Sequence, residues 1–420
     1  MAQPHLSPSS RLEDRWLSGL FLLALLALPV VGLVDGPLYA AVVFSLGGAL
    51  ALHEAIVERR SPMPDRRLLV LALAFAALGW TTVLWSIVPG HSCEAALQLT
   101  AILAGTLVVL GNRLPDERTC RALFRALPFA IALGICVLIA DRALRSGWGS
   151  WFSADITKYN RGLDYLVLIA WPTLAWPIAE RRWRAAATVA GLMLIAVSVG
   201  VSTTGTVALV AGAILLVLAI ALKDAIAPCL FIVITVLAVA QPLILRLLAS
   251  HRHGLEPYVK YSGFHRLEVW DYMSSRVLER PLSGWGLLSS GAVPIRPEEL
   301  AGYSIVKGVG IYPHNQWLQL WLETGLPGIA LALAFVAVVL SNIRRTLPPR
   351  LRPFAFATLG SALTISLLNF EFATDSWWAA LAASALLFKA LAGPNEIGPC
   401  HKTGNQGASG EAPDQVVASV

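Results

Sequence analysis

Long runs of apolar residues alternate with short polar connections along most of this chain. A helix needs about 20 apolar residues to cross the hydrocarbon core of a bilayer, so each run of roughly that length predicts one span. The runs lie near residues 17–34, 37–56, 68–88, 93–111, 122–140, 163–179, 185–201, 204–222, 226–248, 326–341, 353–370 and 374–392. The pattern predicts an all-α polytopic membrane protein with about 12 transmembrane helices. No convincing cleavage site follows the first run, which favours a retained helix over a signal peptide.

Arginines are concentrated in alternate connections, and this asymmetry predicts the orientation of the chain. They are Arg59, Arg60, Arg66 and Arg67; Arg113, Arg118, Arg121 and Arg125; Arg181, Arg182 and Arg184; and Arg344, Arg345, Arg350 and Arg352. Cytoplasmic connections of membrane proteins carry an excess of Lys and Arg, so we assign these connections and both termini to the cytoplasm. The intervening connections, around Asp35, Pro89 and Asn369, are short and poor in cations, which indicates the outer face.

One polar stretch is far longer than the other connections, and it follows the ninth predicted helix on the outer side. Long loops cross a membrane regardless of their charge. We therefore divide the chain into a cytoplasmic segment (1–16), helices one to nine (17–248), a large periplasmic loop (249–325), helices ten to twelve (326–392) and a cytoplasmic tail (393–420). The tail is polar and contains Gly and Pro, a composition typical of disorder.

The large loop contains two predicted amphipathic helices. The first ends at Pro281, and its apolar residues recur at helical spacing: Leu267, Trp270, Met273, Val277 and Leu278. Gly284 and Gly286 then favour a turn with close backbone approach. The second helix is expected to begin at His314 and to break at Gly325, with Trp317, Leu318, Trp321 and Leu322 on the side of His314. We expect both helices at the membrane interface, where Trp and Tyr are enriched.

Composition supports the membrane assignment and excludes several other classes of protein. Apolar residues make up 56% and charged residues 14% of the 420, against roughly 45–50% and about 25% in soluble domains. The net charge of +6 reflects the arginines of the predicted cytoplasmic connections, so we expect no nucleic-acid partner. The five cysteines are scattered without a CxxC pair, which argues against a disulfide framework or a zinc site. We expect no metal and no cofactor.

Three predicted outer segments carry residues suited to chemistry on a phosphorylated lipid. They are the segment from Lys158 to Gly162, the turn at residues 202–205, and the large loop with Arg266 and His314. Arg binds phosphate oxygens bidentately, and it stabilises negative charge on a leaving diphosphate. A His with an ordinary pKa near 6.5 accepts a hydroxyl proton at neutral pH. Together these residues suit the attack of a sugar hydroxyl on a lipid-diphosphate-linked glycan.

Five motifs follow one another through these segments. They are the basic segment at Asn160-Arg161, the Ser/Thr/Gly turn, R-x-x-x-W from Arg266 to Trp270, P-L-x-G-x-G from Pro281 to Gly286, and H-N followed by E-x-G-x-x-G from His314 to Gly328. In this order the chain resembles the O-antigen ligase and polymerase superfamily of bacterial envelopes. The resemblance covers about residues 70–390 and is sharpest from Arg266 to Gly328. Members of that superfamily also have twelve helices, with a large periplasmic loop between helices nine and ten.

The resemblance implies a metal-independent, inverting glycosyltransferase that needs no cofactor and works on the periplasmic side of the bacterial inner membrane. The donor would be an undecaprenyl-diphosphate-linked glycan. The acceptor would be the lipid A core in a ligase or a second lipid-linked repeat unit in an O-antigen or exopolysaccharide polymerase, and the residues do not decide between them. By the same resemblance, His314 activates the acceptor hydroxyl and Arg266 binds the diphosphate. The further candidates for substrate binding are Arg161, Asn315, Trp270 and Glu323.

One position departs from the pattern of that superfamily. Many members carry an Arg just after the Ser of the turn, where this chain has Thr204. The departure removes one candidate cation for the diphosphate. Arg161, at the mouth of the sixth predicted helix, is the candidate replacement.

Each chosen residue also has a structural alternative. His314 would merely start a helix, and Arg266 would reach from an interfacial helix toward water. Asn315 is expected to orient the loop, Trp270 to pack, and Glu323 either to orient His314 or to support the fold. The alternatives at the level of function are a transporter of lipid-linked sugars and a scaffold without catalysis. A transporter needs polar residues deep inside its spans, and these runs carry almost none.

Overall fold

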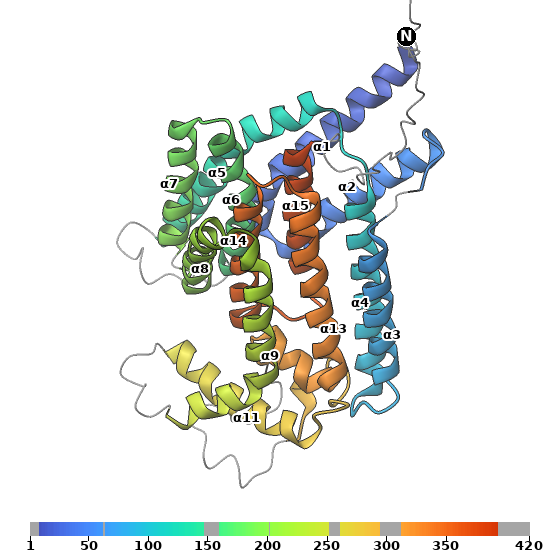
Figure 1. Cartoon of the computed structure of the whole chain (residues 1–420), viewed down its shortest axis with the longest axis vertical. Helices are drawn as coiled ribbons and strands as arrows, with labels where there is room; N and C mark the ends of the chain where they lie inside the picture. The colour runs from blue at the N-terminus through green and yellow to red at the C-terminus, as the bar shows by residue number, and fades with distance from the viewer. Residues whose placement is uncertain are drawn as a thin grey trace, which may run out of the picture.

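The computed structural model describes residues 8–61, 64–146, 159–200, 202–251, 261–294 and 312–393, and all regular structure within these ranges is helical. The helices form one bundle, with α11 lying across one end of it (Figure 1). The α-helices are α1 (Pro8–Val34), α2 (Gly36–Ile56), α3 (Arg66–Thr82), α4 (Pro89–Gly111), α5 (Glu117–Ser146), α6 (Asn160–Ala179), α7 (Trp183–Gly200), α8 (Thr203–Leu222), α9 (Ile226–Ser250), α11 (Tyr261–Glu279), α13 (Gln316–Thr346), α14 (Arg352–Leu368) and α15 (Asp375–Ala392). Two short 3₁₀ turns, η3 (Lys223–Ala225) and η5 (Ser290–Ala292), complete the described elements. The prediction of an all-α protein is confirmed.

The apolar runs of the sequence reappear as helices in the predicted order, each run overlapping one helix. Among the described residues, 8 segments are long and apolar enough to cross a membrane, and one of them, Thr203–Ser250, contains both α8 and α9. Helix α14 is also apolar but shorter. These segments support a multi-pass membrane protein, whereas the number of twelve crossings stays a prediction.

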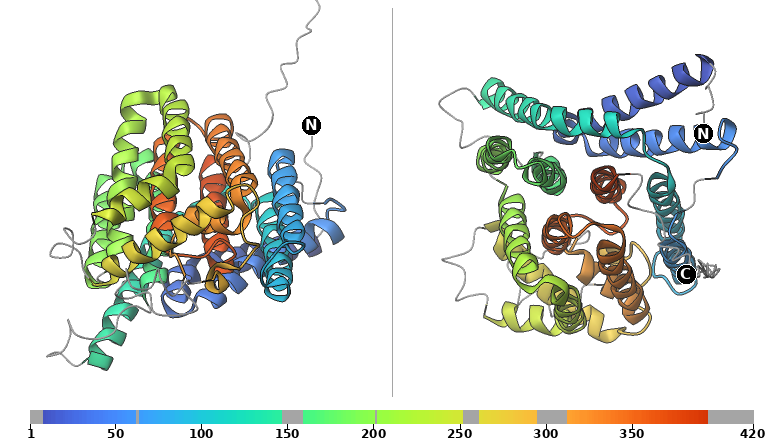
Figure 2. Two further views of the ribbon diagram at one scale, coloured as in Figure 1. Left: turned by 90° about the horizontal axis from the view of Figure 1, so that it is seen from below. Right: turned by 45° about the horizontal axis from the view of Figure 1, so that its top comes forward.

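Helix α6 lies inside the bundle, and this explains why its sequence is apolar on nearly every side. In the most apolar 18 residues of α6, 78% of the residues are buried, against 22% in the corresponding stretch of α8 and α9. Its neighbours include α1, α7, α14 and α15. Helices α8 and α9 instead expose apolar side chains such as Val217 and Val236, which a bilayer accommodates because lipid tails are as apolar as these side chains. Helices α3 and α4 form one flank of the bundle, and α7 and α8 lie at the opposite flank (Figures 1 and 2).

Helix α13 contains the break that the sequence predicts at Gly325, where φ is 63° and ψ is −154°. Such a break leaves backbone groups on both sides of it without helical partners. The turn that follows α11 supplies them through three backbone hydrogen bonds: Trp285 N to Leu322 O at 2.8 Å, Gly286 N to Glu323 O at 3.0 Å, and Leu326 N to Pro281 O at 2.9 Å. The end of α11 is therefore fixed to the break in α13.

Gly284 shows why this joint requires glycine. Its φ is 64°, in the left-handed region, and a Cβ built on it would lie 2.5 Å from the carbonyl carbon of Glu323. Only a residue without a side chain fits such a contact at that φ. The close backbone approach predicted for this turn is therefore confirmed.

Helix α11 packs against α9 and α13 across the end of the bundle. Its apolar face buries Leu267, Met273 and Val277, as the helical spacing predicts, and Glu279 is its last residue. Leu278 is an exception, because 43% of it is exposed. The prediction that Leu278 belongs to the buried face is wrong, since it is adjacent in sequence to Val277 and a helix turns successive side chains about 100° apart.

Candidate functional site

His314 stands just outside α13 rather than starting it. The helix begins at Gln316, and Asn315 is its N-cap: the Asn315 side-chain oxygen accepts from Leu318 N at 3.0 Å and from Gln241 Nε2 of α9 at 3.1 Å. The prediction that the helix begins at His314 is wrong by two residues, because α13 begins at Gln316. The capping bonds leave His314 with a φ of 48°, a conformation that is rare for a non-glycine residue and is often found at functional sites.

Helix α11 is tied directly to the segment that carries His314. The indole Nε1 of Trp270 donates to the backbone oxygen of Pro313 at 2.7 Å. Arg266 precedes Trp270 by one helical turn, so the two side chains share a face of α11. The R-x-x-x-W motif thus places a guanidinium on the same face as the indole that holds the residue before His314.

Three basic side chains act on the His314 imidazole, and together with burial they set its protonation state. Burial lowers the pKa of His314 most, and the charges of Arg266, His265 and Arg161 lower it further, to about 4. The ring of Tyr312 packs edge-on against it, with 4.9 Å between the ring centroids. The imidazole is therefore neutral at neutral pH and has a free nitrogen lone pair to accept a proton.

Arg161 reaches the site from the first turn of α6, although the sequence places it more than a hundred residues before Arg266. Its side chain is exposed, and its guanidinium carbon lies 5.6 Å from the centroid of the Phe370 ring. Beside it is Glu371, whose pKa is raised by burial and lowered by the charge of Arg161. The connection between α14 and α15 thus forms a third wall of the site.

Glu323 is buried and bonded to protein groups. Its carboxylate accepts from Ser290 Oγ at 2.6 Å and from Gln319 Nε2 at 3.0 Å. Gln319 in turn accepts from the hydroxyl of Tyr312 at 3.3 Å, and Tyr312 packs on His314. Glu323 therefore reaches His314 only through two intermediate side chains, which favours the supporting role among the two that the sequence leaves open.

Asp164 is the residue that the sequence does not single out. It lies in α6, is fully buried, and accepts from Asn369 Nδ2 at 2.6 Å. Its second oxygen, Oδ1, has no hydrogen-bond partner among the residues that the structure describes. An acidic residue close to the start of an apolar run is the signal that could have found it. The statement that the predicted spans carry almost no polar groups therefore needs correction at α6.

The turn at residues 202–205 also reaches this end of α6. Ser202 caps α8, its hydroxyl accepting from Gly205 N at 3.0 Å. Thr204 is buried. A Cβ built on Gly205 would lie 3.6 Å from Oδ1 of Asp164, so the turn packs against this carboxyl group.

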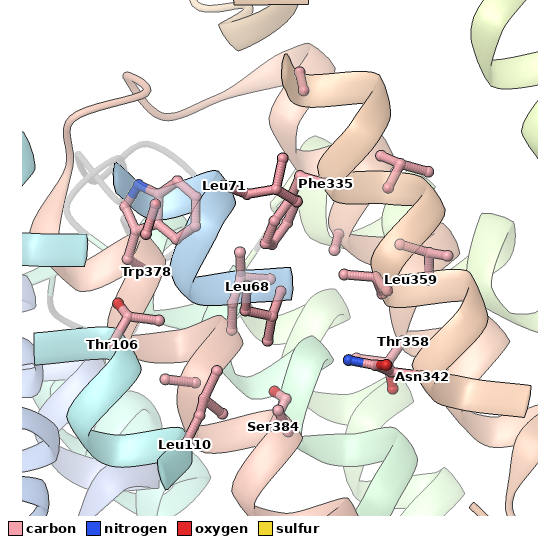
Figure 3. A pocket seen from close by; sticks show the side chains of 18 of the residues that line it. Leu68, Leu71, Thr106, Leu110, Phe335, Asn342, Thr358, Leu359, Trp378 and Ser384 are labelled. Carbon is pink, nitrogen blue, oxygen red and sulfur yellow. The ribbon is translucent and has the colours of Figure 1, made fainter. Parts of the chain in front are cut away.

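A cavity of about 490 Å³ lies beside the site, among α3, α4, α13, α14 and α15. Figure 3 shows Leu68, Leu71, Phe335 and Leu359 directed into it. Its lining is mostly apolar and continues to Gln316 and Trp317, at the start of α13 next to His314. The cavity thus extends along α13, from Gln316 near its start to Thr346 at its end.

The fold and this site define a class of protein, a multi-pass helical membrane protein with a neutral His and two Arg gathered at one end of its bundle. Among the described residues, no group of three or more His, Cys, Asp or Glu is arranged to hold a metal ion.

Residues 186–333, from α7 to the first half of α13, match the family model described as O-antigen ligase. Full-length comparisons give three Rickettsia proteins that are provisionally named polysaccharide ligases. The R. felis protein is 23% identical over 320 residues (73% of this chain, 76% of the relative), the R. bellii protein 26% over 331 residues (76% and 79%), and the R. conorii protein 24% over 305 residues (68% and 73%). These matches show what the chain is similar to: the O-antigen ligase family model over residues 186–333 and the polysaccharide ligases over about three quarters of the chain.

Proposed function

We propose that this protein is a membrane glycosyltransferase that transfers a saccharide from undecaprenyl diphosphate to an acceptor hydroxyl of the lipid A core, on the periplasmic face of the bacterial inner membrane. One observation carries the proposal. A neutral, half-buried His314 is flanked by Arg266 from α11 and Arg161 from α6, so a proton acceptor and two diphosphate-binding cations meet at one place. The similarity to polysaccharide ligases supports the reaction class.

The residues suggest a single displacement. The His314 nitrogen takes the proton of the acceptor hydroxyl as its oxygen bonds to the anomeric carbon. On the opposite side of that carbon, the bond to the diphosphate oxygen breaks, and its electron pair leaves with the diphosphate. Arg266 and Arg161 stabilise the developing negative charge and in this proposal take the place of a metal ion. Because no covalent intermediate forms, the configuration at the anomeric carbon is inverted.

The low pKa of His314 has a consequence for this mechanism. A base with a pKa of about 4 is weak, and general-base catalysis works best with a pKa near the working pH. A bound diphosphate offsets the positive charges of Arg266 and Arg161, and this raises the pKa of His314. Donor binding would thus make the base stronger at the moment it is needed.

The remaining predicted residues support the site in this proposal. Asn315 caps α13 and fixes the backbone after His314, and Trp270 holds the backbone before it. Glu323 acts through Gln319 and Tyr312. The cavity suits the isoprenoid chain of the donor, because its lining is mostly apolar and includes Gln316, two residues after His314.

The deciding experiment measures glycan transfer in nanodiscs that contain the full-length protein, lipid-linked donor and lipid A core. His314→Ala is expected to lower kcat by about 10²- to 10⁴-fold, the usual contribution of a general base. Arg266→Ala should lower kcat/KM because it removes charge stabilisation of the leaving group. His91→Ala is the matched control, because it removes an exposed imidazole at the same end of the bundle. His91 lies on α4 next to Ser92, whose hydroxyl donates to Leu287 O in the segment after α11. Wild-type transfer by His314→Ala would refute the proposal.

A deletion strain separates the two acceptors. Loss of a ligase leaves bare lipid A core on a lipopolysaccharide gel, the result we expect. Core bearing a single repeat unit would instead identify a polymerase, with a second lipid-linked glycan as acceptor.

A further inference from the structure

The guanidinium of Arg161 lies against an aromatic ring rather than a carboxylate. Its Cζ atom is over the Phe370 ring, 5.6 Å from the ring centroid, within the limit of about 6 Å for a cation–π contact. Within the described part of the chain, no hydrogen bond or ion pair engages this guanidinium. The Phe370 ring is therefore the contact that fixes where the side chain of Arg161 points.

Phe370 is itself held in a stack of rings, and only 1% of it is exposed. Its ring stacks on Tyr165, with 5.5 Å between the centroids, and on Trp377, with 5.2 Å. The Tyr165 hydroxyl donates to Ser376 Oγ at 2.7 Å, which fixes this ring in turn. Tyr165 follows Arg161 by four residues on α6, so the two side chains share a helix face and reach the same ring.

The backbone around Phe370 is fixed on both sides. Before it, Asn369 Nδ2 donates to Asp164 Oδ2 on α6 at 2.6 Å. After it, the amide of Phe372 donates to Gln319 Oε1 on α13 at 3.0 Å. The ring thus belongs to a connection that is anchored to two helices, and it has little freedom to move away from the guanidinium.

The same connection lies against the start of α13, close to His314. Gln316 Nε2 donates to the backbone oxygen of Glu371 at 3.4 Å, and Gln316 is two residues after His314. Glu371 directly follows Phe370. These contacts join the segment that holds the Arg161 guanidinium to the segment that carries the proposed base.

An aromatic partner has a chemical consequence that an acidic partner would not have. A carboxylate would occupy N–H donors of the guanidinium and neutralise its charge. The face of a ring instead attracts the cation through its π electrons, so the five N–H donors and the positive charge stay available for phosphate oxygens.

We propose that Phe370 is a positioning residue, whose ring orients the Arg161 guanidinium for the diphosphate of the donor and leaves its N–H donors free to bind that group. This inference rests on the proposed function. Ordering a long side chain at the moment of binding lowers affinity, and a guanidinium that is already held over a ring avoids part of that cost. Phe370 itself touches no substrate in this arrangement, and its effect passes through Arg161.

The test measures binding rather than turnover. Undecaprenyl diphosphate is titrated into nanodiscs that contain the full-length protein, and wild type is compared with Phe370→pentafluorophenylalanine. Fluorine withdraws electrons from the ring and removes its attraction for a cation, whereas the ring keeps nearly the same shape and still stacks. We expect the Kd to rise about fivefold, which is ~1 kcal/mol.

The same replacement at Phe356 is the matched control. Phe356 is a buried phenyl group of α14, and among the described residues no cation lies over its ring. It does not line the cavity proposed for the isoprenoid chain. The Kd of this variant should equal that of wild type.

A double-mutant cycle shows whether the effect passes through Arg161. If it does, the fluorinated ring weakens binding no further once Arg161→Ala is present, whereas a general packing defect adds to that loss. A series of Phe370 replacements with fewer fluorine atoms gives a second measurement that does not depend on the folding of the most fluorinated protein. In this series the Kd should rise with each added fluorine.

Three results would overturn the inference: a wild-type Kd for the fluorinated Phe370 variants, additive losses in the cycle, or an equal loss in the Phe356 control. None of them bears on whether His314→Ala abolishes transfer. A failure of the positioning role and a failure of the proposed function are therefore distinguishable.

Discussion

At the scale of single residues, the protonation of His314 links the site to its neighbours. Four groups face the imidazole: Arg266 and His265 from α11, Arg161 from α6, and Tyr312 from its own segment. The three basic groups all favour the neutral imidazole. A catalytic base must be neutral to accept a proton, so activity should be lost as pH falls through the pKa of His314.

We therefore expect the acid limb of kcat/KM, which reports the free enzyme, near pH 4. In His265→Ala one charge that lowers the pKa of His314 is gone, and the limb should move to higher pH. The acid limb of kcat, which reports the donor-bound enzyme, should also lie higher, because the diphosphate offsets the arginines. Transfer rates measured between about pH 3 and pH 8 provide both limbs, and a limb that does not move in His265→Ala would contradict the expectation.

The sequence singled out Arg266, Arg161 and His314, and in the structure the charges of both arginines act on the His314 imidazole. These three residues could be found from the sequence because each lies in a polar segment that is predicted to be on the outer face, where a basic residue is easily noticed. The sequence did not indicate a role for Asp164, because this residue lies alone within an apolar run. Its hydrogen-bond partner Asn369 is 205 residues away in the sequence. No local spacing records a contact across that distance.

At the scale of elements, helical periodicity predicted α11 and its buried face but misjudged its last turn at Leu278. It also predicted the break at Gly325, since glycine and proline are the strongest local signals of a change in backbone direction. The start of α13 was displaced to Gln316 because Asn315 is an N-cap, and the Asn315 side chain finds its second partner, Gln241, on a distant helix. The glycine motifs were thus predictable, and the cap was not.

The joint between the turn after α11 and the break in α13 should be sensitive to a single methyl group. Gly284→Ala places a Cβ 2.5 Å from a backbone carbon at positive φ, so we expect a loss of about 1–3 kcal/mol and a lower melting temperature in detergent. Gly191→Ala in α7 is the control, because a Cβ there meets nothing within 4 Å. In a helix that change is neutral or stabilising, by up to about 1 kcal/mol. Equal melting temperatures for the two variants would show that the joint is not strained.

At the scale of the whole molecule, hydropathy predicted a multi-pass helical protein and the order of its helices. It did not predict which helices enclose a cavity, because α3, α4, α13, α14 and α15 meet only through the tertiary fold. The central position of α6 was equally hidden, since a run that is apolar on all sides fits both a buried helix and a helix surrounded by lipid.

Ser384→Trp tests whether the cavity holds the isoprenoid chain of the donor, because Ser384 lines it (Figure 3) and an indole would fill part of its volume. The KM for a long-chain donor should rise about tenfold, ~1.4 kcal/mol, whereas the KM for a short-chain analogue should not change. Val217→Trp is the control, since 64% of Val217 is exposed on the outside of α8. An equal change for long and short donors would contradict this role.

The hydrogen bonds that tie α11 to the segment before α13 and to the break in α13 have a mechanical consequence. Trp270, in the middle of α11, holds the backbone of Pro313, and the turn after α11 holds the break in α13. Arg266 and His314 therefore lie on segments that are tied to each other, and Gly325 interrupts α13 beyond them. A bilayer of different thickness tilts transmembrane helices, and we expect the part of α13 after this break to take up that tilt. The distance between Arg266 and His314 should then be insensitive to lipid chain length, and we expect the proposed transfer to run at similar rates in thin and thick membranes.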